Sequence, residues 1–158
     1  MMSMTNELIH VLKKQLGEPV GEAPATLGDW LHARGRASEA LLYAILFMPE
    51  LQLIQDSILL GWNLPDESAK RRFVDVLAEG KQARQQLEAS FNFIEVGYLF
   101  DAPGRDTEDE EDEILAKLIK NAWEGWLKVC YPDRRFKVEV LSPEETGSTV
   151  GVHFFEER

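Results

Sequence analysis

The most concentrated chemistry in this chain is a run of seven carboxylates within eight consecutive positions. They are Asp106, Glu108, Asp109, Glu110, Glu111, Asp112 and Glu113. Such a local negative charge attracts a basic surface on a partner protein and speeds the encounter between the two. The run therefore predicts a partner-binding segment for a basic protein.

Two other interpretations of this run compete with protein binding. Calcium prefers about six to eight oxygens from a spaced loop with a turning glycine, but here the spacing is absent and Gly104 lies before the acids. Acids at the start of a helix are also stabilised by the helix dipole, so the run is typical of a solvated helix start.

A second polar group is expected on a hairpin near the C-terminus. Lys137, Glu139 and His153 lie in two segments whose residues alternate between apolar and polar, which places the three on one strand face. We include them in the predicted partner-binding surface. His10, His32 and His153 are far apart and have no ligand partner at metal spacing, so the sequence predicts neither a metal nor a cofactor.

A catalytic nucleophile is not predicted from the sequence. Cys130 lies on the apolar side of a helix near its C-terminus, where the dipole opposes a thiolate, so we expect an inert buried cysteine. Ser148 lacks the strand, sharp turn and helix of a nucleophile elbow. A small enzyme that uses Glu139, His153 or Tyr98 in a pocket between helices and sheet remains an alternative, with no reaction specified.

Composition limits the class of protein. The chain has 158 residues with 44% hydrophobic and 28% charged residues, which is typical of one globular domain over residues 1–158. Net charge is −11; without the seven acids it is −4, from 21 acidic and 17 basic residues. This balance excludes direct phosphate contact with nucleic acid. No signal peptide or membrane span is predicted, and we expect a cytoplasmic protein.

The elements that must position these residues are a helix and a hairpin. Apolar residues from Ile114 to Cys130 fill about 220° of a helical wheel, which predicts a helix covered on two sides. Residues 136–140 and 150–155 alternate with period two and predict strands, joined by a turn at 142–148. Arg134 and Arg135, just before the first strand, are expected to face solvent or to pair with the acidic run.

The rest of the chain shows helical patterns and one strand-like stretch. We expect helices over 1–16, over 26–35 with Thr26 and Asp29 as a capping box, over 38–48, and from a cap at Asn63 to Gly80. Gly17 to Pro24 predicts a connection. The apolar run Ala40 to Met48 predicts burial. Residues 51–60 favour strand. Residues 91–100 fit helix or strand, and we favour a helix ending between Ser90 and Glu95.

These patterns predict an α+β fold, with helices packed on one face of a small, mostly antiparallel sheet and a C-terminal β-hairpin. The functional hypothesis is a non-catalytic protein-binding module, such as an inhibitor, an immunity-like protein or an adaptor, which uses the acidic loop. Two alternatives are the small enzyme and a self-associating protein, such as a homodimer formed through the hairpin edge or residues 81–100.

Overall fold

The computed structural model describes residues 3–17 and 26–158, and these residues form helices, two small sheets and short 3-10 turns. The elements are α1 Met4–Leu16, α2 Leu27–Arg34, α3 Ala37–Phe47, β1 Leu51–Ile54, β2 Ser57–Leu60, η1 Gly61–Asn63, α4 Glu67–Glu79, α5 Arg84–Phe91, β3 Ile94–Glu95, η2 Val96–Tyr98, η3 Ala102–Gly104, α6 Asp109–Cys130, β4 Phe136–Leu141, α7 Pro143–Thr146 and β5 Gly151–Glu156.

Both sheets are antiparallel, which confirms the α+β class and the C-terminal hairpin. Strands β1 and β2 form one hairpin, and β3, β5 and β4 form a three-stranded sheet with β5 in the middle. In the hairpin of β4 and β5, Val138 pairs with Phe154 and Glu139 pairs with His153. The apolar and polar residues therefore lie on opposite faces, as the period of two predicts.

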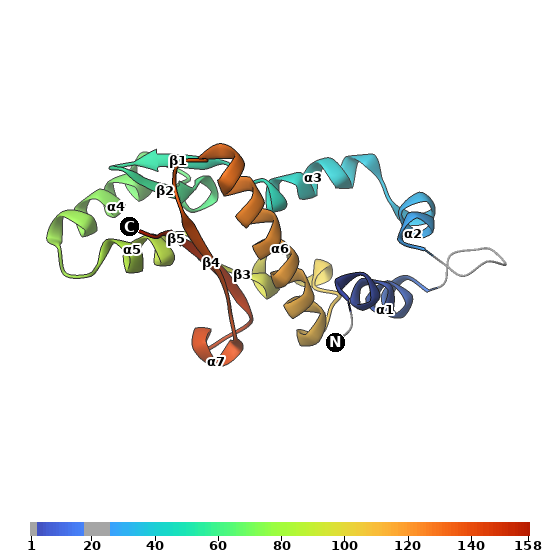
Figure 1. The fold of residues 1–158 in the computed structure, drawn as a ribbon. Coiled ribbons are helices and arrows are strands. Elements are labelled where there is room, and N and C mark those ends of the chain that lie inside the picture. The colour runs from blue at the N-terminus through green and yellow to red at the C-terminus, as the bar shows by residue number, and fades with distance from the viewer. Residues whose placement is uncertain (1–2, 18–25) are drawn as a thin grey trace.

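Helix α6 runs along the larger sheet and separates two parts of the molecule (Figure 1). Helices α4 and α5 lie with the β1–β2 hairpin at one end, and α1, α2 and α3 lie on the other side of α6. We call the first part, residues 49–158, the body, and the second, residues 3–17 and 26–48, the arm.

The body is held by a core between α6 and the hairpin. The buried residues of α6 that face the sheet are Ala116, Ile119, Trp123 and Leu127, at the three- and four-residue spacing of one helix face. The Trp123 ring meets Trp62 and Phe154 edge to face, with ring centres 6.5 and 5.8 Å apart. Its indole nitrogen donates to the Leu46 carbonyl at 2.9 Å, so this large side chain is both packed and satisfied.

Asn92 links the two sheets inside the body. Its side-chain oxygen accepts from the Leu60 amide at 2.8 Å, and its side-chain nitrogen donates to the carbonyls of Ile58 and Phe154 at 3.0 and 3.2 Å. Asn92 is fully buried. Buried backbone groups need hydrogen-bond partners, and this one side chain provides a partner for three such groups in the two sheets.

The apolar side of α6 is narrower than the sequence predicts. Val129 is 72% exposed and Cys130 is also exposed, so the expectation of an inert buried cysteine is wrong about burial. Leu127 in the same last turn is buried, so the core covers only one side of this turn. Gly125 is also exposed, and a Cβ built on it would meet no atom within 4 Å. Close packing therefore does not explain this glycine.

Several boundaries differ from the sequence prediction. Helix α4 begins at Glu67 with Asp66 as its cap, accepting from the Ala69 amide at 2.8 Å, whereas Asn63 lies in η1. The ambiguous segment resolves into the end of α5, the short strand β3 and η2. The predicted turn at 142–148 contains α7. The predicted connection from Gly17 to Pro24 lies outside the described residues except for Gly17.

Candidate protein-binding surface

Helix α3 exposes a set of large apolar side chains, which contradicts the burial predicted for Ala40 to Met48. The exposed fractions are 76% for Leu41, 60% for Leu42, 41% for Tyr43, 53% for Ile45 and 52% for Met48, the residue that ends the helix. The one fully buried side chain within α3 is Leu46, which joins the main core. An apolar sequence indicates that the side chains of a helix favour burial. It does not indicate whether the same chain or a partner buries them.

The composition of α3 explains both its structure and its unusual surface. The sequence ASEALLYAILF holds good helix formers, and its only charged residue is Glu39 in the first turn. Apolar residues therefore surround the helix instead of forming one stripe. A helix that is apolar on all sides is normally buried, whereas only one side of α3 meets α6.

A groove runs between α3 and the body. It is lined on one side by Leu42, Tyr43, Ile45 and Leu46, on the other by Trp62, Leu99 and Phe100, and measures about 430 Å³. The Tyr43 and Phe100 rings meet edge to face with centres 6.3 Å apart, which closes one end. The lining is predominantly apolar, as expected for a site that takes an apolar side chain.

The indole nitrogen of Trp62 is a buried donor with no hydrogen-bond partner in the part of the chain that the structure describes. Leaving such a donor unpaired costs about 1–3 kcal/mol. Trp62 lines the groove and also a neighbouring hollow that contains Tyr98 and Glu95. The unpaired indole nitrogen of Trp62 therefore lies next to the groove between α3 and the body.

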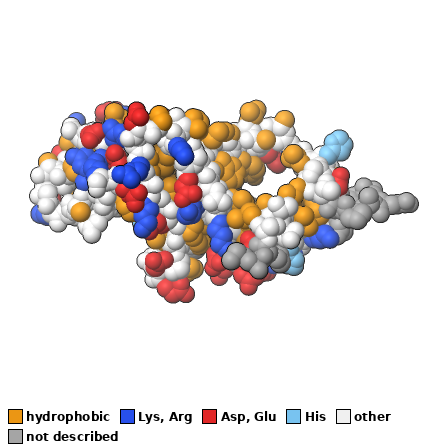
Figure 2. Space-filling view, viewed as in Figure 1, with side chains coloured by type: hydrophobic (Ala, Val, Ile, Leu, Met, Phe, Trp, Pro, Cys, Tyr) orange, Lys and Arg blue, Asp and Glu red, His pale blue; other side chains and the backbone are white. Residues whose placement is uncertain are grey.

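Figure 2 shows an opening through the molecule, with hydrophobic side chains along much of its edge. The opening lies between α3 and α1, as comparison with Figure 1 shows, and the acidic side chains at the start of α6 lie below it, at the lower edge of the view. Helix α1 contributes Leu8, Val11 and Leu12, which are only partly buried. The apolar surface of α3 therefore borders this opening.

The predicted acidic run divides into residues with internal partners and residues that face solvent. Glu108 is the cap of α6, and Glu111 accepts from the Glu108 amide at 2.6 Å to complete a capping box. Lys14 of α1 reaches both carboxylates, at 2.8 Å from Glu108 and 2.7 Å from Glu111, and Gln15 donates to Glu111 at 3.1 Å. These two acids attach α1 to α6.

The electrostatics of this contact agree with its geometry. The hydrogen bond from the Glu108 amide, with those from Lys14 and Gln15, lowers the pKa of Glu111 to about 2 from an ordinary 4.5. The two carboxylates raise the pKa of Lys14 above its usual range, chiefly through hydrogen bonds to Glu108 and Glu111. Glu111 is thus charged and engaged at neutral pH.

Of the remaining acids, Asp112 accepts a hydrogen bond from the Thr107 hydroxyl at 2.6 Å. Four carboxylates, Asp106, Asp109, Glu110 and Glu113, are exposed. We call these four the acidic rim. They lie just before α6 or in its first two turns.

The polar hairpin group is assembled as the register predicts. Glu139 accepts from Lys137 at 2.6 Å and contacts the Nε2 atom of His153 at 3.0 Å. The hydrogen bond from His153, then that from Lys137, lowers the pKa of Glu139, and Glu139 raises the pKa of Lys137. No hydrogen bond or ion pair joins this trio to the acidic rim within residues 3–17 and 26–158.

The arginine pair before β4 does not pair with the acidic run. Arg134 instead binds Asp56 at 2.6 Å and Glu156 at 3.0 Å. Arg158 contacts the same two acids and the buried Glu88, which also accepts from the Ser57 hydroxyl at 2.7 Å. The network connects the β1–β2 turn to the end of β5, so its role is structural.

The residues of the alternative enzyme are not gathered into one cavity. Tyr98 lines a hollow with Glu95 and Ser148, and neither Glu139 nor His153 lines it. Within the described residues, no three His, Cys, Asp or Glu side chains are grouped so as to hold a metal ion. The pKa of the Cys130 thiol is raised by desolvation, which disfavours its nucleophilic thiolate form.

Sequence reasoning missed the groove because its two sides come from distant segments. The available signal was the run from Ala40 to Met48, which is too apolar on all sides for a helix that packs against a single neighbour. No helix among the described residues is both long and apolar enough to cross a membrane. No protein-family model, curated protein or solved structure gives a significant match to this chain.

Proposed function

We propose that this chain is a non-catalytic protein-binding module, of the inhibitor, immunity-like or adaptor kind, and that its partner docks an amphipathic basic helix on α3. The observation that carries the proposal is the exposed apolar surface of α3 beside the groove. Contiguous exposed apolar surface on a soluble protein is typical of a binding site.

The shape and chemistry of the surface favour a helical segment. Helix-in-groove recognition places apolar side chains, spaced three or four residues apart, into a hydrophobic groove. The groove beside Leu42, Ile45 and Trp62 offers an apolar floor with aromatic walls, which is where such anchors contribute most to binding.

The charge around the surface favours a basic partner over a second copy of this chain. The acidic rim lies at the start of α6, and the whole chain carries a net charge of −11. A two-fold pair of identical chains brings the same surfaces together, so two chains of this charge repel each other. Lysines or arginines beside the apolar stripe of a partner helix would instead be attracted.

The proposal is tested with a model peptide of leucine and lysine, about 14 residues long, with leucines at helical spacing. Binding is measured by calorimetry against the full chain. A peptide of the same composition with the spacing scrambled is the control. The Leu42→Asn and Ile45→Asn double variant should weaken binding about tenfold or more, because it removes two apolar contacts worth about 1.4 kcal/mol or more together.

A matched variant separates docking on α3 from general stickiness. Leu53→Asn removes a side chain on β1 that is equally exposed and lies outside the groove, so it should leave the affinity unchanged. Asp109→Asn with Glu110→Gln should weaken binding at low salt and less at high salt. Equal binding of both peptides, or equal losses from the α3 and Leu53 variants, would contradict the proposal. A concentration-dependent dimer lost in the α3 variant would show a second copy as the occupant.

A further inference from the structure

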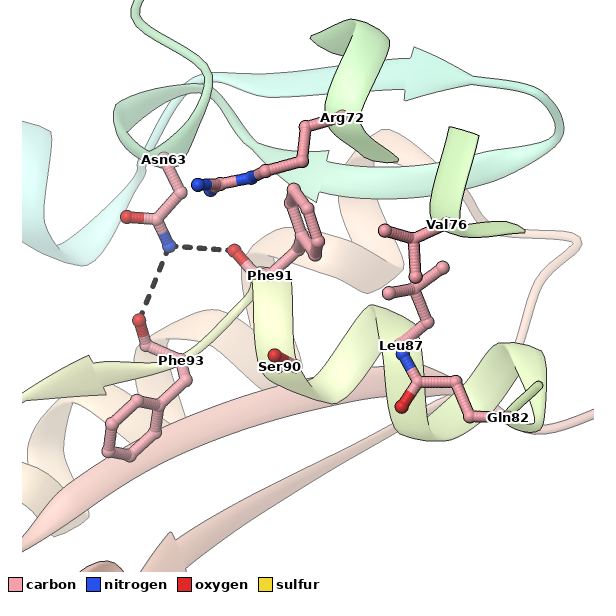
Figure 3. Close-up of a pocket in the computed structure, with 8 residues that line it drawn as sticks. All are labelled: Asn63, Arg72, Val76, Gln82, Leu87, Ser90, Phe91 and Phe93. Atoms are coloured by element: carbon pink, nitrogen blue, oxygen red, sulfur yellow. Dashed lines mark hydrogen bonds between the residues drawn. The ribbon is translucent and has the colours of Figure 1, made fainter. Parts of the chain in front are cut away.

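Helices α4 and α5 enclose a second pocket, separate from the groove, in the body. It measures about 500 Å³ and lies between Arg72 and Val76 of α4 and Ser90 and Phe91 of α5 (Figure 3). Asn63 forms part of its wall by donating to the carbonyls of Phe91 and Phe93, at 2.7 and 3.3 Å. These two hydrogen bonds hold the end of α5 against η1 and give the pocket a defined shape.

Arg72 differs from the three arginines whose hydrogen bonds join segments of the body. Arg134 and Arg158 bind carboxylates, and Arg84 donates to the Gln55 carbonyl at 2.6 Å. Arg72 has no hydrogen bond or ion pair with any described residue; its guanidinium carbon lies 5.3 Å from the centre of the Phe91 ring. Figure 3 shows its side chain reaching across the pocket toward Asn63.

Stacking leaves the hydrogen-bonding edge of a guanidinium available. The contact with Phe91 involves the ring and the guanidinium carbon, whereas the N–H groups of an arginine point outward in the plane of the fork. That fork fits a carboxylate in a bidentate pair, with charge-assisted bonds stronger than neutral ones. Arg72 is therefore oriented by Phe91 and still has its donors available for a ligand.

The local charge of this hairpin is opposite to that of the whole chain. Residues 67–91, which span α4 and α5, contain five basic and four acidic side chains, although the net charge of the protein is −11. An anion at Arg72 is therefore apart from most of the negative charge that the chain carries. The rest of the lining includes Val76, Leu87 and Phe93, which suit an apolar group next to that anion.

We propose that the α4–α5 pocket binds a carboxylate that is attached to an apolar or aromatic group, with Arg72 as the residue that holds the carboxylate. Two sources have this chemistry, a small organic acid and the C-terminal carboxylate of a peptide that ends in an aromatic residue. The apolar group packs on Phe91 and Val76, and the hydroxyl of Ser90 is available as an additional donor. This site does not depend on the proposed docking surface on α3.

The test is a titration of the full chain followed by amide chemical shifts. The probes are 3-phenylpropionate and its uncharged amide, together with an acetylated Ala-Ala-Phe peptide carrying a free or an amidated C-terminus. The free acids should shift the backbone amide signals of Gln82, Ser90 and Phe91. The two uncharged probes, the phenylpropionamide and the amidated peptide, should bind about tenfold more weakly or not at all. Tighter binding of the peptide would identify a protein C-terminus as the source of the carboxylate. Tighter binding of phenylpropionate would identify a small organic acid.

Arg71 supplies a matched control, because it neighbours Arg72 on α4 but does not line the pocket. Arg72→Leu should weaken the binding of the free acids about tenfold. Arg71→Leu removes the same charge and should change their affinity less than about twofold. Unchanged urea midpoints in both variants establish that they are folded. Equal effects of the two variants, equal binding of acid and amide, binding of inorganic phosphate alone, or no shifts with any probe would each overturn the proposal.

Discussion

The body and the arm use apolar residues in opposite ways. In the body, Trp123 and Phe154 are almost fully buried and every large side chain around them meets another. In the arm, α3 is more apolar than α6, yet most of its large side chains are exposed. The difference shows that an apolar sequence indicates side chains that favour burial. The topology of the fold decides whether other parts of the same chain bury them.

The attachments of the two parts differ as well. The body is joined by sheet hydrogen bonds, by Asn92 and by the arginine network. The arm is attached through Leu46 in the core and through Lys14 on Glu108 and Glu111. If stability follows burial, substitutions in the body should be severe and substitutions in the arm mild. The predictions below run from the largest expected effect to the smallest.

Trp123→Ala should produce the largest loss of stability, about 3–5 kcal/mol in the free energy of unfolding. The substitution opens a cavity between α6 and the hairpin and leaves the Leu46 carbonyl without its donor. Urea denaturation followed by circular dichroism measures it. Val129→Ala on the same helix is the control and should change stability by less than about 0.5 kcal/mol, because that side chain is exposed.

Asn92→Ala should destabilise the protein by about 2–4 kcal/mol, since three buried backbone groups lose their partner at once. The same urea titration measures the loss, with Asn121→Ala on the exposed side of α6 as the reference. If Asn92→Ala were as mild as Asn121→Ala, the link between the two sheets would not depend on this side chain.

Lowering the pH should release α1 from α6 through Glu111. Because its folded pKa of about 2 is below the ordinary 4.5, the contribution of Glu111 to stability is present above about pH 4.5 and is lost as the pH falls toward 2. The side-chain amide signal of Gln15, which donates to Glu111, should therefore titrate near pH 2.

Glu111→Gln should abolish that titration and weaken the Lys14 contact at neutral pH. Glu110→Gln, one residue away on the exposed rim, should leave the Gln15 signal unchanged. A midpoint near 4.5 in the unsubstituted chain would show that Glu111 does not hold the arm.

The double variant Leu42→Asn and Ile45→Asn should have the smallest effect on stability, less than about 1 kcal/mol in total, because both side chains are already exposed. The urea midpoint measures it. A loss comparable to that of Trp123→Ala would mean that the arm is covered in solution, and the comparison between arm and body would fail.

Local patterns in the sequence predict parts of both the body and the arm. Alternation predicts the hairpin of β4 and β5 and its polar face, and the capping box of Thr26 with Asp29 is confirmed at 2.8 Å from the Asp29 carboxylate to the Thr26 amide. These features depend on residues a few positions apart, so the sequence alone is sufficient for them.

Features that depend on distant contacts could not be predicted in this way. Lys14 meets Glu111 across almost a hundred residues, and this contact turns two predicted partner-binding acids into internal attachments. The groove combines Leu42 with Trp62 and Phe100, and the second pocket combines Arg72 with Phe91. Neither combination leaves a periodic signal in the chain, because tertiary packing alone brings the residues together.

Amide hydrogen exchange along α3, with and without the leucine–lysine peptide, tests the central claim most directly. In the free chain, α3 should exchange much faster than the buried part of α6, since exposed elements open at low free energy. Addition of the peptide should slow exchange in α3 and around Leu99 and Phe100 and leave the rest of the body unchanged. Slow exchange of α3 before the peptide is added, or no change after it, would contradict the account.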